Sequence, residues 1–475
     1  MPAVRGQRRS PSLHAMVGGA FVLWGLALGL VALHDNSFLT HLATGRLMLR
    51  HGIPTRDPYS FTASGAPWVV ESWLASLAYA LVERLGGGHG LVLLHAALAA
   101  VLAGLVWVLS RPAGTLAGRV VASAATVAVG TGYWSPRPLL IALVLLGVVV
   151  VMAEGRAGRP WMLVPLMWVW VNVHGSWPVG LVYLVLRMAG RLVERRPLER
   201  LPRLAGAMAV GVALGAANPY GVRLLTYPLV VVTHHQAFAH IVEWQSPRFS
   251  TPANAVFLVE ALAALVLLVA RRGRAEDALV VVVFGAGALL AARNVPVAAL
   301  VTTPVLARGL AGLGTVTGDR RSPVTGLLLG SVGGALGLLM VAGAMARPAY
   351  DLVDYPVAET AWMQAHGVSL GAVIAPDYVG NYLEFRDGPQ ADVFIDDRAD
   401  MYPARVEQAF ATLQGGGPGW QRILTAYRPT ALLWPRRQPL ARLVARDPAW
   451  RVVLADRAWV VAVPRTESLV LARTG

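Results

Sequence analysis

The stretch LHDNSFLTHLATGRLMLRHGIPTRDPYSFTASGAPWVVESWL, residues 33–74, determines how the rest of the chain is interpreted. It follows an apolar run at about residues 14–33 that is long enough to cross a bilayer. The stretch itself is rich in histidine, arginine, aspartate and glutamate and contains two tryptophans. Because ionisable side chains are costly inside a bilayer, we expect this stretch to lie just outside the membrane, after the first span.

The composition is typical of a membrane protein. Of the 475 residues, 56% are hydrophobic and 14% are charged, whereas a soluble protein carries about 25% charged residues. Apolar runs of about 18 residues or more recur along most of the chain. The sequence therefore predicts a mainly α-helical, polytopic membrane protein.

The basic residues that give the net charge of +15 are all arginine, because the chain contains no lysine. They cluster in short segments between apolar runs, as in the cytoplasmic loops of membrane proteins, and this distribution argues against a nucleic-acid partner. The absence of cysteine excludes disulfides, zinc–thiolate sites and thiol catalysis. The first apolar run lacks a small-residue cleavage site, so we expect it to be a retained span.

The arginine-rich loops also predict the topology. The basic N-terminus should stay in the cytoplasm, so the first span carries Asp35 to the outside. A short, charged helix at residues 71–85 ends at three glycines, and we expect it to lie at the interface without crossing. Counting it as a span would place the most basic loop, residues 187–203, outside. The charge rule thus favours about eleven spans, with the N-terminus inside and the C-terminus outside.

Loops rich in histidine, tryptophan, asparagine and aspartate alternate with the arginine-rich loops, and we expect them to share the outer face. They are the large first outer loop, 34–88, and residues 133–138, 172–177, 218–223, 233–248 and 292–296. From about residue 347, period-two strands and short helical patterns replace the spans. The predicted strands lie at 371–376, 391–396, 430–435, 450–456 and 458–464. We therefore predict a transmembrane helical domain at 1–346 and an extracytoplasmic α/β domain at 347–475.

Asp35 and Asp57 are the candidate catalytic carboxylates of the first outer loop. A carboxylate at the outer end of a span is well placed to take a proton from a hydroxyl acceptor. The alternatives are a helix-end carboxylate that only fixes the span for Asp35, and a turn residue before proline for Asp57. His34, His41 and His51 would complete a site for Mg²⁺ or Mn²⁺, although their spacing matches no dedicated metal motif; hydrogen bonding alone is the alternative.

Arg137 and Arg293 lie at predicted outer helix ends, where the positive-inside rule gives no reason for an arginine. Arginine is the natural bidentate partner of a phosphate, so phosphate binding is one explanation. A salt bridge to Asp35, Glu71 or Glu243 is the other.

Residues 172–177 (NVHGSW) and 218–221 (NPYG) combine hydrogen-bonding side chains with aromatic rings, a pairing that suits sugar binding. Aromatic belts at membrane interfaces give the same pattern. In the tail, Asp396 and Arg398 follow a predicted strand in FIDDRADMY, residues 394–402. This group suits a metal or sugar hydroxyls, or an internal Asp–Arg network.

One long span, a large outer loop that opens with an acidic residue, an interfacial helix and a second span together resemble the GT-C superfamily of integral-membrane glycosyltransferases. Along nearly its whole length the chain is also similar to a broad set of bacterial membrane proteins. The matching residues are His41, Leu42, Gly45, Arg46, Pro54, Asp57, Pro58, Ser60, Trp68, Glu71, Trp73, Leu74, Asn172, His174, Gly175, Asn218, Pro219, Gly221, Gly380, Tyr382, Leu383, Phe394, Ile395, Asp396, Arg398 and Tyr402. The chain departs from better-known GT-C members because His34-Asp35 stands where they have an acidic pair.

The resemblance implies inverting transfer of a sugar from a polyprenyl-phosphate donor to an envelope glycan, lipid or protein acceptor, at the outer face of the bacterial inner membrane. Asp35 would be the general base, and Arg137 or Arg293 would hold the lipid phosphate. No cofactor other than the divalent metal is implied. The expected substrate-binding residues are His41, Arg46, Glu71, Trp73, Arg137, Asn172, His174, Trp177, Asn218, Tyr220, Glu243, Arg293, Asn294, Asp396 and Arg398.

Two other functions remain open. A transporter or flippase-like component of envelope polysaccharide export would need polar groups at mid-membrane depth in several spans. A non-catalytic membrane protein would use the tail to bind a partner. The spans are almost purely alanine, valine, leucine and glycine, with polar residues at their ends, and this pattern favours the enzyme.

Overall fold

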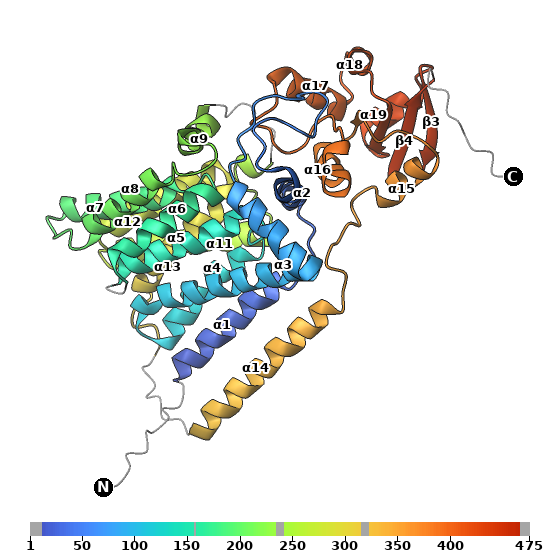
Figure 1. Cartoon of the computed structure of the whole chain (residues 1–475). Helices are drawn as coiled ribbons and strands as arrows, with labels where there is room; N and C mark the ends of the chain where they lie inside the picture. The colour runs from blue at the N-terminus through green and yellow to red at the C-terminus, as the bar shows by residue number, and fades with distance from the viewer. Residues whose placement is uncertain (1–11, 156–157, 234–241, 315–322, 466–475) are drawn as a thin grey trace, which may run out of the picture. The chain divides into compact units, whose positions relative to one another are not determined.

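The computed structural model describes residues 12–155, 158–233, 242–314 and 323–465 (Figure 1). The basic N-terminus and residues 234–241 of the predicted outer loop 233–248 lie outside the described residues. The structure is 66% helix and 6% strand, which confirms the prediction of a mainly helical chain with a small sheet. It divides into two compact units, Met1–Leu33, Leu85–Gly221 and Ala239–Ala349 in unit 1, and His34–Arg84, Val222–Phe238 and Tyr350–Gly475 in unit 2.

Unit 1 is a helical bundle whose core is aliphatic and aromatic. Its elements are α1 (Leu13–Gly29), the larger part of α3 (Trp73–Leu109), η1 (Arg111–Ala113), α4 (Leu116–Gly130), α5 (Pro138–Glu154), η2 (Pro160–Met162), α6 (Leu163–Val173), α7 (Pro178–Val193), α8 (Leu201–Leu214), η3 (Val242–Trp244), α11 (Pro252–Ala270), α12 (Ala275–Leu290), η4 (Ala292–Asn294), α13 (Val295–Gly309) and α14 (Pro323–Met345). Helix α13 is the central element, because nearly all of its side chains are buried. It packs against α4, α5, α11 and α12.

Among the residues that the structure describes, three segments are long and apolar enough to cross a membrane: Trp73–Ala113, α11, and Gly326–Met345 of α14. The apolar helices α1, α4, α5, η2–α6 and α8 are shorter. An α-helix of 15 residues rises only about 22 Å, less than the roughly 30 Å of a bilayer core. The chain is therefore compatible with a membrane protein, and the prediction of about eleven spans is not confirmed.

Helix α3 breaks at the glycines where the interfacial helix was expected to end. Gly87 has φ 61° and ψ −161° inside an otherwise helical run. A positive φ is costly for residues with a Cβ atom, so glycine is the residue that permits this break. The part of α3 before Leu85 belongs to unit 2 and the part from Leu85 onward belongs to unit 1.

Unit 2 combines helices with one four-stranded sheet. Its elements are α2 (Asn36–His51), the start of α3, α9 (Val222–Thr233), α15 (Val357–Ala365), β1 (Val373–Ile374), α16 (Asp377–Asp387), η5 (Gly388–Gln390), α17 (Ala404–Gly415), α18 (Trp420–Tyr427), β2 (Ala431–Pro435), α19 (Pro439–Val444), β3 (Trp450–Ala455) and β4 (Trp459–Pro464). The strand order is β1-β2-β4-β3; β1 runs parallel to β2, and the other neighbours are antiparallel. Four of the five predicted strands are therefore confirmed.

The fifth predicted strand, at 391–396, is wrong. Val393 forms only isolated bridges, to Ser60 and to Val373. Residues of the first outer loop lie beside it: the Phe61 amide donates to the Val393 carbonyl at 3.1 Å, and the Val393 amide donates to the Tyr59 carbonyl at 2.8 Å. Segments from both ends of the chain thus form one core.

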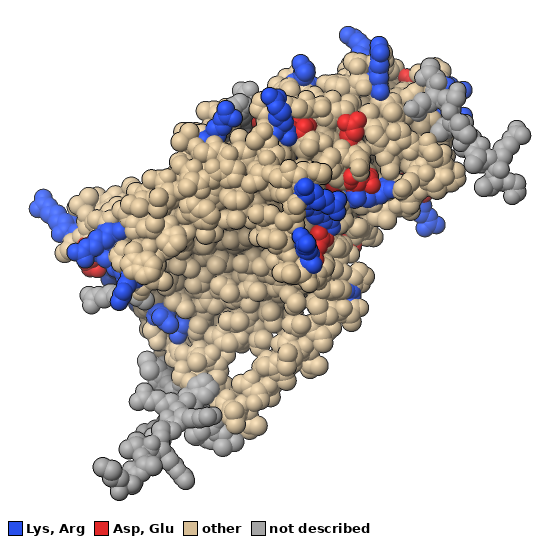
Figure 2. All heavy atoms as spheres, in the orientation of Figure 1, with Lys and Arg blue, Asp and Glu red and all other residues tan. Residues whose placement is uncertain are grey.

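Charged side chains are sparse on the surface over α14, which carries no charged residue (Figure 2). Many of its leucines are exposed, with Leu338 at 74%. An apolar surface of this kind suits contact with lipid.

Candidate functional sites

Unit 1 carries two groups of charged side chains at opposite ends of the same helices. Helix α5 begins after Arg137 and ends at Glu154, while α12 has Glu276 in its first turn and is followed by Arg293. We call Arg137, Glu243 and Arg293 the arginine pair site. The buried ion network is Glu154, Arg187, Arg191, Arg196, Glu276, Asp277 and Arg308.

In the arginine pair site, one carboxylate joins two guanidinium groups from distant parts of the sequence. Arg137 Nη1 lies 2.8 Å from Glu243 Oε2, and Arg293 Nη1 lies 3.9 Å from Glu243 Oε1. The Arg293 guanidinium also stacks over the Trp244 ring at 4.2 Å. The side chains of Arg137, Glu243 and Arg293 are 29%, 39% and 27% exposed. Two cations and one anion leave one positive charge in a half-buried place, which suits an anionic ligand.

Local backbone structure explains how these side chains meet. Arg137 is the N-cap residue of α5, where a cation is unfavourable next to the positive end of the helix dipole, so the contact with Glu243 offsets that cost. Arg293 lies just beyond the C-terminus of α12, where a cation is favourable. The Ala292 amide donates to the Gln245 carbonyl at 2.9 Å, which fixes the segment containing η3 against η4.

His174 lies within electrostatic reach of Arg293 and Glu243 and is buried. Its Nδ1 accepts the Ser176 amide at 3.1 Å, so the turn after α6 holds the ring in place. Asn172 is fully buried and donates from Nδ2 to the Trp168 carbonyl at 2.7 Å. His174 therefore joins the arginine pair site, while the amide of Asn172 has a helix-capping role.

The other predicted residues of unit 1 have local hydrogen-bonding or packing roles. Asn218 forms a turn in which Oδ1 accepts the Tyr220 amide at 2.7 Å and Nδ2 donates to the Gly215 and Gly221 carbonyls. Asn294 donates to the Gly287 carbonyl at 2.9 Å. Trp177 is the N-cap residue of α7 and packs against the core.

In unit 2, Asp35 is the N-cap residue of α2. Its Oδ1 accepts the Phe38 amide at 3.1 Å, a contact that satisfies one of the unpaired donors at the helix start. His41 Nδ1 lies 3.1 Å from the Ser76 hydroxyl. Arg46 donates to both oxygens of Glu83 and to the Phe385 carbonyl. These contacts fasten α2 to its neighbours in unit 2.

Arg398 is buried at the centre of a second group in unit 2, with three carboxylates and two rings around it. It lies 2.9 Å from Asp57 Oδ1 and 2.5 Å from Asp396 Oδ2. Glu384 is 3.4 Å away, and the rings of Tyr59 and Trp68 lie 5.0 Å and 4.4 Å from the guanidinium.

This geometry matches the internal Asp–Arg network that the sequence left open for the tail, extended to Asp57. Asp57 also accepts the Tyr59 and Ser60 amides and the Ser60 hydroxyl. Burial opposes ionisation of Asp396, but the adjacent Arg398 outweighs it and holds the Asp396 pKa below its usual range. Burial and the neighbouring Asp396 raise the pKa of Glu384.

Glu71 and Asp400 are two carboxylates that lie near each other in unit 2. Burial, and next the charge of Glu71, raise the pKa of Asp400 to about 6, while a hydrogen bond from Tyr227 of α9 works in the opposite direction. Trp73 begins α3 two residues after Glu71.

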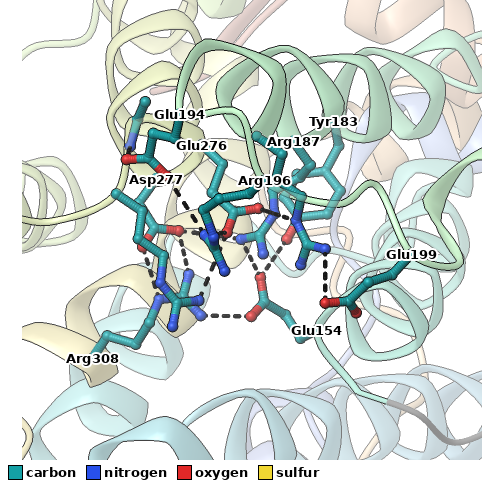
Figure 3. Close-up of polar contacts among 12 residues, drawn as sticks. Glu154, Tyr183, Arg187, Glu194, Arg196, Glu199, Glu276, Asp277 and Arg308 are labelled. Atoms are coloured by element: carbon teal, nitrogen blue, oxygen red, sulfur yellow. Dashed lines mark hydrogen bonds and ion pairs between the residues drawn. The ribbon is translucent and has the colours of Figure 1, made fainter.

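The buried ion network joins the ends of four helices, as Figure 3 shows. Arg187 of α7 is 2% exposed and contacts Glu154 at 2.6 Å, Glu276 at 3.1 Å and Asp277 at 3.2 Å. Arg308 of α13 contacts Glu154 and Asp277, each at 2.5 Å. Each carboxylate of this network contacts at least two arginines.

Sequence reasoning did not single out this network, although Arg187, Arg191 and Arg196 lie in the basic loop 187–203, which the charge rule assigned to the inner side. Arg187 and Arg191 are one turn apart on α7, and both contact Glu276, which heads α12. Arginines at i and i+4 lie on one face of a helix, but Glu276 follows Arg191 by 85 residues, so no local spacing indicated this pairing. The acidic first turn of α12 and the basic last turns of α7 and α13 also complement the helix dipoles.

Sequence reasoning also missed an ionisable residue in the middle of α11. Glu260 is 2% exposed, and its Oε1 accepts the Thr126 hydroxyl at 3.0 Å. The Thr126 hydroxyl lies 2.8 Å from that of Thr303. The three side chains come from α11, α4 and α13, so polar groups do occur within the apolar part of the bundle.

The metal site expected around His34, His41 and His51 finds no geometric counterpart. Within the described ranges, no group of three or more histidine, aspartate and glutamate side chains is arranged to hold a metal ion. The candidate base Asp35 belongs to unit 2, and Arg137 and Arg293 belong to unit 1.

No protein-family model matches the chain, and no curated protein is similar enough to it to count as a match. Function must therefore be inferred from the geometry of the sites.

Proposed function

We propose that the protein is a membrane glycosyltransferase that takes a sugar from a polyprenyl-phosphate donor and transfers it to an envelope acceptor on the outer face of the membrane. The observation that carries the proposal is the convergence of Arg137 and Arg293 on Glu243, beside His174. Two half-exposed guanidiniums suit a lipid phosphate, which needs charge-assisted hydrogen bonds at the membrane boundary. Trp244 beside them offers a ring for a sugar or prenyl group.

The reaction proposed is an inverting displacement. The acceptor oxygen forms a bond to the anomeric carbon, and the bond between that carbon and the phosphate oxygen breaks. Polyprenyl phosphate leaves with the electron pair and gains charge that the two arginines stabilise. Asp35 takes the proton of the acceptor hydroxyl.

The arginine pair is tested with Arg137→Ala and Arg293→Ala in membranes supplied with polyprenyl-phosphate sugars. Loss of one charge-assisted contact should lower transfer about 10- to 100-fold. Arg248→Ala, at an exposed arginine of the same segment, is the matched control and should keep transfer unchanged. Undiminished transfer by both Arg137→Ala and Arg293→Ala would rule out this phosphate site.

Asp35 is tested with Asp35→Asn, because asparagine caps a helix about as well as aspartate but cannot accept a proton. We expect transfer to fall by about 100-fold or more, the contribution of a general base, while thermal stability stays unchanged. Asp35→Ala is the comparison for the capping role and should destabilise α2 by about 1 kcal/mol. Full transfer by Asp35→Asn would leave Asp35 with the capping role alone.

A transporter or flippase-like function is the second candidate, favoured by the mid-helix contact of Glu260 with Thr126. The two functions separate in liposomes that contain the purified chain. Movement of a polyprenyl-linked sugar across the bilayer without donor cleavage, lost in Glu260→Gln and retained in Arg293→Ala, would favour transport over sugar transfer.

A further inference from the structure

The middle of helix α11 contains a carboxyl group, that of Glu260, which has no cationic partner among the described residues. Glu260 is the ninth residue of the 19-residue helix, which is itself a candidate membrane span. The Glu260 carboxyl is buried, and its Oε1 accepts a hydrogen bond from the Thr126 hydroxyl. Its other oxygen, Oε2, is buried and has no hydrogen-bond partner among the described residues.

The helices packed against α11 supply hydroxyl groups and apolar side chains near this carboxyl. They are α4, α12 and α13. Thr126 of α4 contacts Glu260 and Thr303 of α13, and Thr303 also lies 3.0 Å from the Ala299 carbonyl. The core around Ala264, one turn further along α11, contains Val281 of α12 and Val305 and Leu306 of α13. No ion pair of Glu260 occurs in the part of the chain that the structure describes.

An ionised carboxylate in this place would be very costly. Transfer of an unpaired charge into a low-dielectric interior costs several kcal/mol even after relaxation, and neutralisation by a proton avoids that cost. One hydroxyl hydrogen bond at 3.0 Å does not replace the hydration shell of a carboxylate. Since Oε2 is buried and has no hydrogen-bond partner among the described residues, water does not solvate it without a change in the structure.

A cavity of about 320 Å³ lies next to this carboxyl. Its walls include Val121 and Ala125 of α4, Val259 and Ala263 of α11, and Leu306 of α13, together with Glu260 itself. Val121 and Val259 are 46% and 66% exposed, so the cavity borders the outer surface of α4 and α11. An apolar cavity at such a surface admits lipid-soluble molecules and disfavours water.

We propose that Glu260 is an intramembrane proton-binding site, held as a neutral carboxylic acid in this structure, and that the cavity between α4 and α11 gives lipid-soluble reagents access to it. Release of the proton requires water or a polar group to reach Oε2, and thus a rearrangement of α4 relative to α11. This property belongs to Glu260 whether or not the protein transfers sugars. It gives the protein a means of coupling a conformational change to a proton.

The test uses dicyclohexylcarbodiimide on the full chain in membranes at neutral pH. A protonated carboxyl adds across one C=N bond of the reagent: the oxygen bonds to carbon, and the proton goes to nitrogen. Migration of the acyl group to nitrogen then gives a stable N-acylurea that retains every atom of both reactants. Exposed glutamates, with an ordinary pKa of about 4.3, are almost fully ionised at neutral pH and react poorly.

We expect one reagent molecule per chain on the peptide that contains Glu260. Labelling of this peptide should fall by at least about 10-fold in Glu260→Gln, since an amide cannot react in this way. Glu199→Gln is the matched control, because the Glu199 side chain is 54% exposed. Equal labelling of Glu260→Gln and the unaltered chain would overturn the proposal.

A second measurement does not depend on reagent access. The infrared spectrum of the unaltered chain at neutral pH, minus that of Glu260→Gln, should contain the carbonyl band of a protonated carboxylic acid. A carboxylate band in its place would overturn the neutral state of Glu260. The acid band without any labelling of Glu260 would overturn the access route through the cavity.

Discussion

The two ends of the unit 1 bundle use the same residue types in different ways. At one end, the buried ion network matches each carboxylate with at least two arginines, and its central members are almost fully closed to solvent. At the other end, two arginines share one carboxylate and remain about one quarter to one third exposed. Dense, dry pairing holds helices together, whereas sparse pairing with surplus positive charge leaves room for a ligand.

The largest expected effect comes from Arg187→Met in the buried ion network. Removing this guanidinium leaves Glu154, Glu276 and Asp277 with fewer partners, and uncompensated buried charge costs about 3–5 kcal/mol in the free energy of unfolding. Thermal unfolding of the purified chain in detergent measures the loss. Arg274→Met is the control, because the Arg274 side chain is 49% exposed and 3.7 Å from Glu276; it should cost less than about 1 kcal/mol. Equal effects from the two changes would contradict the role of burial in the stability of the ion network.

The same substitution at both ends gives a sharper comparison. Glu276→Gln should destabilise the chain by about 3 kcal/mol, because four neighbouring arginines lose a buried anion. Glu243→Gln should change stability by less than about 1 kcal/mol, since the Glu243 side chain is 39% exposed.

Glu243→Gln should also raise the affinity for polyprenyl phosphate by roughly 3- to 10-fold, because it removes the anion that competes for Arg137 and Arg293. Binding of the lipid to the purified variants, measured by native mass spectrometry, checks this result. Weaker binding by Glu243→Gln would mean that Glu243 positions the arginines and does not compete with the ligand.

The smallest expected effect concerns pH and unit 2. The folded-state pKa of Asp400, about 6, lies above its ordinary value, so the folded chain binds this proton more tightly than the unfolded chain. That contribution to stability is complete at low pH and is lost as the pH rises through about 6.

Asp400→Asn should therefore be more stable than the unaltered chain at neutral pH by about 1 kcal/mol, with the difference disappearing below about pH 4. Hydrogen exchange of α16 and β2 across this pH range measures the difference. Asp354→Asn, at an exposed aspartate of the same unit, should show no such trend. A difference between Asp400→Asn and the unaltered chain that does not depend on pH would exclude titration as its cause.

What the sequence predicted correctly depends on local patterns. Short apolar strand patterns identified β1 to β4, although β1, β2 and β4 are buried almost throughout and only β3 has exposed residues. The same pattern failed at 391–396, where Val393 is bridged by Ser60 from a remote segment. A salt bridge from Arg137 to Glu243 was among the alternatives stated, since opposite charges at helix ends on one face tend to pair.

What the sequence did not reveal depends on pairings between distant segments. The buried ion network needs residues from α5, α7, α12 and α13 at once, and no spacing in the sequence records which loops meet. Glu260 was overlooked because one acidic residue hardly changes the hydropathy of a 19-residue apolar run. The two cases share a cause, which is that tertiary packing sets the environment of an ionisable group.

The joint core of unit 2 has a consequence for the order of events during synthesis. Ala63 of the first outer loop packs with Ile374 and Phe394 near the other end of the chain. Since a ribosome adds about 5–20 residues per second, roughly 15–50 s separate the emergence of Arg84 from that of Tyr350. During that interval Asp57 lacks its ion-pair partner Arg398, so a chaperone that binds exposed loops has time to act. A protein truncated before residue 350 would have Asp57 and Ala63 without their partners from the later part of the chain.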